Sequence, residues 1–377
     1  MTSINRRDVF WILGGAAVAG IAPPSFAAGT EDRKFIFVLL RGGLDGLATL
    51  VPKDPELEAL RPTLHTIANE GPEIASAFQL HPALPGLHTL YQSGEATFVH
   101  AAATAYRERS HFDAQDQLET LSQPGTRIGW LNRLSRETAA AGLGVGYALP
   151  LALKGPASTT NWAPAAFRPA STDLLDRLNQ LYADDTDFQE TLITARQMTT
   201  GNMNINATRQ RGNEAAAEQS FRAIGKLMAE PGGPGIGMVS VDGWDTHANQ
   251  SAALGNRLHL LDTALLALKD ELGSQWAKIC ITICSEFGRT AAENGTRGTD
   301  HGTGGLLILA GGAVQGGKVA GDWPGLRDAD LREKRDLAPA NAVEDVLAGI
   351  VGEHLGADWR SVIPAASKPF SGLIRST

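Results

Sequence analysis

Two apolar segments that enclose a polar loop, in the last third of the chain, constrain the fold more than any other feature. The first, residues 279–284 (ICITIC), is a β-branched run typical of a strand that is buried on both faces. Glu286 and Arg289 follow it directly, and His301 lies in a glycine-rich loop just before the second apolar run, residues 306–310. Because ligands bind at the carboxyl edge of the strands in open α/β sheets, the pattern predicts a ligand site here.

Further apolar runs predict the rest of a sheet. They lie at residues 34–40, 97–103 and 237–241. Strands that are apolar throughout are typical of a parallel sheet covered by helices on both faces. The leucine spacing over residues 252–272 predicts one of these helices. We therefore expect one α/β domain over residues 28–377, with a largely parallel central sheet, helices on both faces and a helical insertion at about residues 155–232.

The amino terminus predicts a targeting segment. Arg6 and Arg7 precede a moderately apolar stretch at residues 11–21, and residues 25–27 (SFA) form an A-x-A-like cleavage site. The stretch is too short and too rich in glycine and alanine for a stable membrane span. We interpret residues 1–27 as a cleaved twin-arginine signal, which places the protein in the periplasm or cell envelope and makes the export machinery a partner. An ordinary secretory signal and an uncleaved anchor are the alternatives.

Charge and cysteine content argue against a nucleic-acid-binding protein and against a disulfide-rich protein. The formal net charge is −8 and the chain has no basic run, so nucleic acid is not expected as a partner. Cys280 and Cys284 are four residues apart on one expected strand, which places their Cα atoms roughly 13 Å apart. This separation exceeds the reach of a disulfide, and we expect two buried free thiols rather than a disulfide framework.

The nine histidines divide into groups with different settings. Four fall in expected helices and are expected to be exposed, namely His65, His88, His259 and His354. By contrast, His111, His247 and His301 lie in loops at the expected ligand edge, with Asp245 just before His247 and Asp300 just before His301. Clusters of histidine and aspartate at strand ends are what a metal-assisted hydrolase needs. Ordinary polar turns are the alternative.

Two more positions have a functional and a structural interpretation. Asp45 follows the first expected strand and is either a metal ligand or a turn residue that binds backbone amides, while Arg41 beside it could contact an anion. Ser110 precedes an expected helix. It is either the N-cap, with Asp113 completing a capping box, or a nucleophile that faces a phosphate or sulfate group, because a helix amino terminus stabilises anions.

Five motifs carry a resemblance to a known family. They are LRGGLDG at residues 40–46, RSHFDAQ at 109–115, GWDTH at 243–247, SEFGRT at 285–290 and GTDHG at 298–302. With these motifs the chain resembles the uncharacterised family of domain of unknown function 1501, twin-arginine-exported bacterial proteins placed in the alkaline phosphatase and sulfatase superfamily. The resemblance implies an alkaline-phosphatase-like fold with metal ligands at the carboxyl ends of strands and a nucleophile at a helix amino terminus, where Ser110 stands.

The resemblance also implies roles for single residues. Asp245 and His247 resemble the ligands of one divalent metal, and His301 resembles the late histidine that completes its site. Glu286 and Phe287 stand where the phosphomutase branch of the superfamily has aspartate and histidine. The carboxylate is therefore retained, but Phe287 cannot bind a metal.

We therefore predict an exported hydrolase of phosphate or sulfate esters that uses a divalent metal, either zinc, calcium or magnesium. Its substrate would be a small anionic ester or a sulfated or phosphorylated glycan. The predicted metal ligands are Asp45, Asp245, His247, Glu286, Asp300 and His301. The predicted catalytic residues are Ser110 as nucleophile, His111 as general acid, and Arg289 or Arg41 as the clamp for anionic oxygens. The alternative is a catalytically degenerate envelope protein that binds a glycan or a protein partner.

Overall fold

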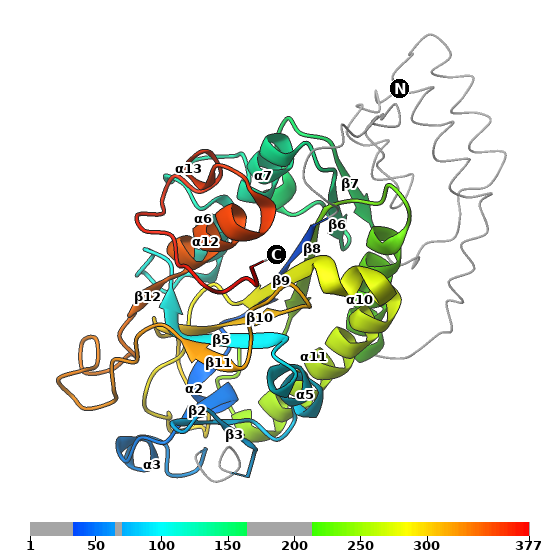
Figure 1. Ribbon diagram of the computed structural model, residues 1–377. Helices are drawn as coiled ribbons and strands as arrows, with labels where there is room; N and C mark the ends of the chain where they lie inside the picture. The colour runs from blue at the N-terminus through cyan, green and yellow to red at the C-terminus, as the bar shows by residue number, and fades with distance from the viewer. Residues whose placement is uncertain (1–32, 65–69, 164–212, 377) are drawn as a thin grey trace, which may run out of the picture.

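The computed structural model describes residues 33–64, 70–163 and 213–376 (Figure 1). The expected signal at residues 1–27 lies outside the described residues, as does the middle of the expected insertion, residues 164–212. Within the described part, no helix combines the length and the apolar composition that a membrane crossing requires.

A nine-stranded sheet forms the centre of the fold (Figure 1). Its strands are β1 (Lys34–Arg41), β5 (Ala96–Ala103), β6 (Gly142–Val145), β7 (Thr159–Trp162), β8 (Ile236–Asp242), β9 (Ile279–Cys284), β10 (Gly305–Ala310), β11 (Lys318–Ala320) and β12 (Asn341–Ala342). The main path runs β11-β5-β10-β9-β1-β8-β6-β7, and β12 pairs with β5. Every pairing is parallel except the two that β10 makes with β5 and β9. The prediction of an α/β fold with a largely parallel sheet is confirmed.

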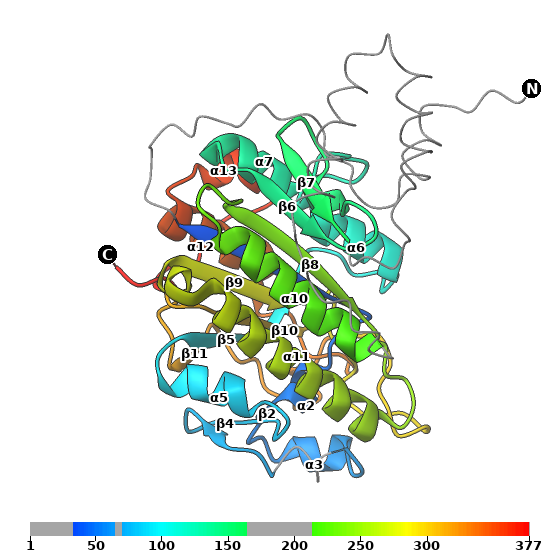
Figure 2. The same ribbon diagram turned by 90° about the vertical axis from the view of Figure 1, so that its right-hand side faces the viewer.

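Helices cover both faces of this sheet (Figures 1 and 2). One face is covered by α5 (Pro85–Gln92), α10 (Asn213–Ala229) and α11 (Gln250–Leu272). The opposite face is covered by α6 (His111–Thr120), α7 (Trp130–Thr138), α12 (Val343–Leu355) and α13 (Trp359–Val362). Because both faces are covered, the strands are buried on both sides, which explains why their sequences are apolar without alternation.

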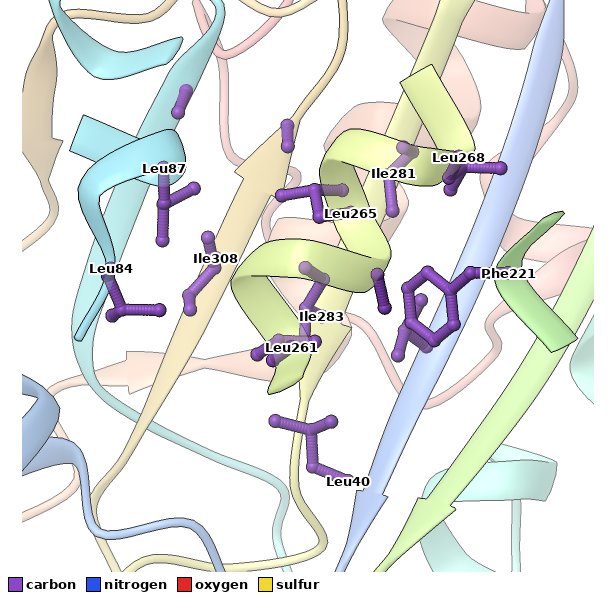
Figure 3. Packing of buried hydrophobic residues seen from close by; sticks show 14 of the residues in the cluster. Leu40, Leu84, Leu87, Phe221, Leu261, Leu265, Leu268, Ile281, Ile283 and Ile308 are labelled. Atoms are coloured by element: carbon purple, nitrogen blue, oxygen red, sulfur yellow. The ribbon is translucent and has the colours of Figure 1, made fainter. Parts of the chain in front are cut away.

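The leucine spacing of α11 explains how this helix packs. Leu261, Leu265 and Leu268 recur at the interval of one helical turn and lie against Ile281 and Ile283 of β9 (Figure 3). All five side chains are at most 3% exposed. Burial of each such side chain contributes about 1.5–3 kcal/mol to folding, so this contact holds α11 firmly beside the site-bearing loops.

Short elements complete the described chain. A second sheet has the order β2-β4-β3, with β2 (Leu50–Pro52), β3 (Glu73–Ile74) and β4 (Phe78–Leu80). The remaining helices are α2 (Gly46–Thr49), α3 (Glu56–Leu60) and the 3₁₀ helices η1 (Leu151–Leu153) and η2 (Gly273–Lys278).

The described ends of the expected insertion belong to the sheet and its helical cover. Strand β7 pairs with β6 at the edge of the sheet. Helix α10 buries Phe221, Ile224 and Met228 completely in the same core cluster as α11. These described parts of residues 155–232 therefore pack into the layers of the domain.

The direction of β10 determines which loops meet at the ligand edge of the sheet. Because β10 runs opposite to β1, β5, β8 and β9, its amino end lies at the same edge as their carboxyl ends. The loops after these four strands and the loop before β10 therefore meet. All five motifs of the sequence fall in or beside these loops.

Candidate metal centre

Three side chains from three separate loops converge at this edge. His111 is the first residue of α6, Asp245 lies in the loop after β8, and His301 lies in the loop before β10. Each offers a ligand atom, and these atoms all lie within 4.8 Å of one another. Nε2 of His301 lies 3.0 Å from Nε2 of His111 and 3.2 Å from Oδ1 of Asp245. The group has the composition of a metal site.

The hydrogen bonds behind the two imidazole rings fix their tautomers. Nδ1 of His111 lies 2.7 Å from Oε1 of Glu286, and Nδ1 of His301 lies 3.1 Å from the backbone oxygen of Arg109. Both oxygens accept only, so each Nδ1 carries a proton and donates it. In the neutral rings each Nε2 is then a bare lone pair. Two bare nitrogens 3.0 Å apart cannot bond to each other, so the pair needs a shared proton or a metal ion.

The donor geometry fits an ion of the size of zinc. Tetrahedral zinc with Zn–N bonds of about 2.0 Å places its ligand atoms about 3.3 Å apart. Nε2 of His111 lies 3.0 Å from Nε2 of His301 and 3.5 Å from Oδ2 of Asp245, and Nε2 of His301 lies 3.2 Å from Oδ1 of Asp245. Carboxylate and carbonyl partners behind ligating histidines are the usual support of such sites. The residues present therefore fit a divalent metal.

His247 lies on the other side of His301 and Asp245. Its Nε2 atom is 3.0 Å from Nε2 of His301 and 2.9 Å from Oδ1 of Asp245. Its Nδ1 atom is 3.2 Å from Oδ1 of Asp300, which also accepts a hydrogen bond from Asn294. His247 thus extends the cluster, whereas Asp300 stands behind His247 in the same way that Glu286 stands behind His111.

Glu286 occupies a supporting place rather than the ligand place expected for it. Its Oε1 atom accepts hydrogen bonds from Nδ1 of His111 at 2.7 Å, from Nε2 of Gln115 at 2.8 Å and from the amide of Gly42 at 2.9 Å. The side chain is fully buried behind the histidine. Oε1 is thus fully used by these donors, and Oε2 lies 2.9 Å from the hydroxyl of Ser285.

Gly42 lets the loop after β1 approach the loop after β8. Its φ is +122°, and a Cβ atom added there would lie 2.5 Å from the amide nitrogen of Asp245. Any other residue would push the two loops apart, so glycine is required by this close approach.

The charges of the cluster stabilise ionised carboxylates. Burial alone would raise the pKa of Asp245, but the Arg289 guanidinium that donates to it holds this pKa below its usual range. Burial likewise opposes ionisation of Glu286, and the hydrogen bonds from His111 and Gln115 outweigh it, so its pKa is lowered. The hydrogen bond to Glu286 raises the pKa of His111, whereas burial and the neighbouring His111 lower the pKa of His301. The pKa values of the two histidines are thus shifted in opposite directions.

The two arginines expected to clamp a substrate anion are used within the protein. Arg289 is 1% exposed and donates to the backbone oxygens of four loop residues and to Oδ1 of Asp245 at 2.6 Å. Arg41 binds Gln115 and forms an ion pair with the buried carboxylate of Glu119 at 2.6 Å. Arg289 therefore joins the loops and orients Asp245, and Arg41 joins β1 to α6.

Asp45 lies outside the cluster. It caps α2 by accepting from the amide of Ala48 at 3.1 Å, and it forms an ion pair with Arg61 at 2.9 Å. Both charged side chains are 1% exposed, and Gln250 and Thr299 also donate to Oδ2 of Asp45. Of its two interpretations, the structural one describes this environment, because all its acceptors are occupied by the protein.

Ser110 stands at the N-cap position of α6, but its side chain makes no capping hydrogen bond. Asp113 contacts the hydroxyl of Tyr106 at 3.5 Å, so the expected capping box is not formed. Among the described residues nothing bonds to the Ser110 hydroxyl, which lies half-buried beside His111. This hydroxyl is available for chemistry in a way that a capping serine is not.

Sequence reasoning assigned a different role to His111 and missed several supporting residues of the site. His111 was expected to act as a general acid, yet one ring nitrogen faces Glu286 and the other faces His301. Its place at the start of the helix that follows β5 could have signalled a ligand. Phe287 contributes an apolar wall, with its ring centre 4.8 Å from that of His111 and 5.0 Å from that of His301. The supporting roles of Gln115 and of the Arg109 carbonyl had no local signal.

An α/β fold with a cluster of histidine and carboxylate at the carboxyl edge of its sheet defines a candidate metal protein. The family model described as "Protein of unknown function (DUF1501)" matches residues 104–363, and the chain belongs to this family. The family expected from the five motifs is therefore confirmed. Comparison with curated proteins found no match to this chain.

Solved structures with a similar arrangement include three that are described as sulfatases or as complexes with an oligosaccharide. The structure of Ps i-CgsB in complex with k-i-k-neocarrahexaose has a TM-score of 0.45 and 11% identity, covering 90% of this chain and 75% of that chain. BT1596, a 2-O GAG sulfatase, has a TM-score of 0.42 and 9% identity, covering 77% and 66%. The PsFucS1 sulfatase from Pseudoalteromonas sp. has a TM-score of 0.36 and 13% identity, covering 86% and 72%.

Proposed function

We propose that this protein is an exported, metal-dependent hydrolase of phosphate or sulfate esters. The observation that carries the proposal is the 3.0 Å approach of Nε2 of His111 to Nε2 of His301, beside the carboxylate of Asp245. Both rings present bare nitrogens, so a cation is the natural occupant of the space between them. Export through the twin-arginine route is proposed from residues 1–27 of the sequence.

The proposed ion is zinc or a transition metal of similar preference. His111 and His301 offer nitrogen atoms and Asp245 offers one oxygen, whereas calcium and magnesium prefer sites built from oxygen alone. When bound, such an ion supplies Lewis-acid polarisation of an ester oxygen. Arg289 keeps Asp245 ionised and oriented for this purpose, and Glu286 orients the ring of His111 by accepting the proton on its Nδ1.

Ser110 is the proposed nucleophile. Its hydroxyl is not used as a helix cap, and it precedes the proposed ligand His111 by one residue. It stands at the amino terminus of α6, a helix of ten residues whose first backbone amides favour a negatively charged group. His111 is proposed as a ligand and not as the general acid, because both of its ring nitrogens are engaged.

Arg335 is the proposed contact for the anionic group of the substrate. Its Nη1 atom donates to the backbone oxygen of His301 at 3.0 Å and to Asp336 at 2.7 Å. The side chain is 40% exposed, and its Nε and Nη2 atoms make no hydrogen bond with any described residue. A guanidinium with free donors beside His301 suits a sulfate or phosphate ester, small or attached to a glycan.

One observation favours the second candidate, a binding protein without catalysis. Arg41 and Arg289, the two arginines expected from the sequence to clamp the substrate anion, are occupied by protein acceptors. A protein that had lost catalysis could keep the fold and the cluster for binding a glycan or a protein partner. The two candidate functions require the same fold, but only the hydrolase turns over a substrate.

Metal analysis and a substrate panel test the proposal together. Protein purified from the exported fraction should contain close to one equivalent of tightly bound divalent metal. It should hydrolyse at least one member of a panel of aryl phosphates and aryl sulfates, and a chelator should abolish this activity. Bound metal without turnover would favour the binding protein. Less than about half an equivalent of metal after loading with zinc would overturn the metal centre itself.

A further inference from the structure

Asp336 is a fully buried carboxylate that belongs to none of the five motifs. Its Oδ2 atom accepts hydrogen bonds from Nε and Nη2 of Arg109, at 3.0 and 2.8 Å, and from the hydroxyl of Thr303 at 3.0 Å. Its Oδ1 atom accepts from Nη1 of Arg335 at 2.7 Å. One buried carboxylate thus binds donors from three separate segments, and a buried charge persists only with such partners.

Each of these three partners of Asp336 contacts His301 or lies in the same loop. The backbone oxygen of Arg109 accepts the proton on Nδ1 of His301 at 3.1 Å. Nη1 of Arg335 donates to the backbone oxygen of His301 at 3.0 Å as well as to Asp336. Thr303 follows His301 by two residues in the same loop. Asp336 is therefore connected to the ring of His301 through Arg109 and to its backbone through Arg335.

The backbone at Arg109 shows that this arrangement is held against a local preference. Arg109 has a φ of +60°, in the left-handed region that side chains other than glycine disfavour. It directly precedes Ser110 and His111, so its conformation sets where the first residues of α6 enter the site. The two hydrogen bonds from its guanidinium to Asp336 tie it in this conformation.

We propose that Asp336 is a positioning residue that holds His301 in its metal-binding orientation, through Arg109 and Arg335. This inference rests on the proposed metal centre. A ligating imidazole binds well only when its plane and tautomer are fixed by partners on its other nitrogen, and Asp336 fixes the residue that provides that partner. Asp336 itself does not reach the metal.

Zinc affinity of the Asp336→Asn variant tests the proposal. Asparagine keeps the shape of the side chain but removes the charge and replaces one acceptor by a donor. We expect zinc binding, measured by competition with a chromophoric chelator, to weaken by roughly 10–100-fold. The visible spectrum of the cobalt-loaded variant should also differ from that of the cobalt-loaded wild type, because the spectrum reports the ligand geometry.

Asp330→Asn is the matched control. Asp330 lies six residues before Asp336 in the same loop and also binds an arginine, Arg327, at 2.6 Å. In that pair Arg327 is exposed and Asp330 is half-buried, and neither forms a hydrogen bond or ion pair with any described residue of the cluster. The control should bind zinc and show the cobalt spectrum of the wild type.

A second variant covers the case in which Asp336→Asn fails to fold. Arg109→Met removes both hydrogen bonds to Oδ2 of Asp336 but keeps the backbone oxygen that faces His301. We expect a similar loss of zinc affinity. Where both single variants fold, the double variant should lose little more zinc affinity than either one, since both variants remove the contact between Arg109 and Asp336.

The outcomes separate this inference from the proposed function. Wild-type zinc affinity and cobalt spectrum in a folded Asp336→Asn or Arg109→Met protein would overturn the positioning role and leave the metal centre intact. A lower melting temperature with unchanged zinc affinity would show that Asp336 is only structural. If the wild type itself binds neither zinc nor cobalt, the proposed metal centre fails and this inference fails with it.

Discussion

Oε1 of Glu286 lies 2.7 Å from Nδ1 of His111, and this contact assigns different roles to the two carboxylates of the site. Glu286 stands behind a histidine, where it fixes the tautomer and makes the opposite nitrogen a better donor to a metal. Asp245 instead presents its oxygens to Nε2 of His111 and of His301, at 3.5 and 3.2 Å. Glu286 therefore supports a ligand from behind, whereas Asp245 itself faces the proposed metal position.

His301→Ala should remove most of the metal affinity. The free energy of binding a structural zinc ion, about 10–16 kcal/mol, is shared among its few ligands, so losing one should weaken binding by about 3 kcal/mol, or roughly 100-fold. Metal stoichiometry and melting temperature, measured together, check this. His259→Ala, at an exposed position of α11, is the control and should keep the metal. Unchanged metal content in a folded His301→Ala protein would contradict the site as described.

Ser110→Ala should abolish hydrolysis but leave the metal and the stability nearly unchanged. Loss of a true N-cap costs about 0.5–2 kcal/mol, whereas the Ser110 hydroxyl makes no cap bond, so the cost should stay below about 0.5 kcal/mol. Asp358→Ala provides the comparison, because the Asp358 side chain caps α13 by accepting from the amide of Arg360 at 3.1 Å. Turnover equal to wild type in Ser110→Ala would refute the proposed nucleophile.

Asp45→Asn should destabilise the fold without releasing metal. The Asp45 carboxylate and the Arg61 guanidinium are both 1% exposed, and removing one charge of such a pair leaves the other buried and uncompensated, at a cost of about 3–5 kcal/mol. Chemical denaturation and metal analysis of the folded variant check this. Asp328→Asn, which disrupts the exposed pair with Lys334, should change stability by less than about 1 kcal/mol. Loss of metal from a folded Asp45→Asn protein would instead support the interpretation of Asp45 as a metal ligand.

The protein should lose stability as the pH falls from about 6.5 to about 4, in part because of His354. Burial lowers the pKa of His354 to about 4, while the ring donates to the backbone oxygen of Lys34 at 2.9 Å. Between these pH values His354 is protonated in the unfolded chain but stays neutral in the folded chain. Its contribution to stability is therefore complete above pH 6.5 and falls with acidification, by up to about 3 kcal/mol.

His354→Gln tests this contribution, since glutamine cannot titrate. Unfolding free energies at pH 7 and pH 4.5 should differ less in the variant than in the wild type. His259→Gln is the control for an exposed histidine and should keep the wild-type difference. A variant that loses as much stability on acidification as the wild type would exclude His354 as the cause.

The sequence by itself determined the secondary structure near the site and the edge at which the site lies. Residues 279–284 and 306–310 were expected as strands, and the structure has β9 and β10 there. These runs are legible because a strand buried on both faces must be apolar at every position, which is a local property. The same local patterns placed His111, His247 and His301 in loops of one edge, and the structure brings them into one cluster.

Only the tertiary structure decided which partner each polar side chain takes. His354 was expected to be exposed on a helix but is 1% exposed, because α12 buries the face that carries it. Arg289 was expected to clamp a substrate, yet its donors are taken by loop oxygens and Asp245. Asp336 had no motif at all. Burial and hydrogen-bond partners depend on residues that are distant in the chain, so no local pattern could have shown that Glu286 supports His111 while Asp245 faces it.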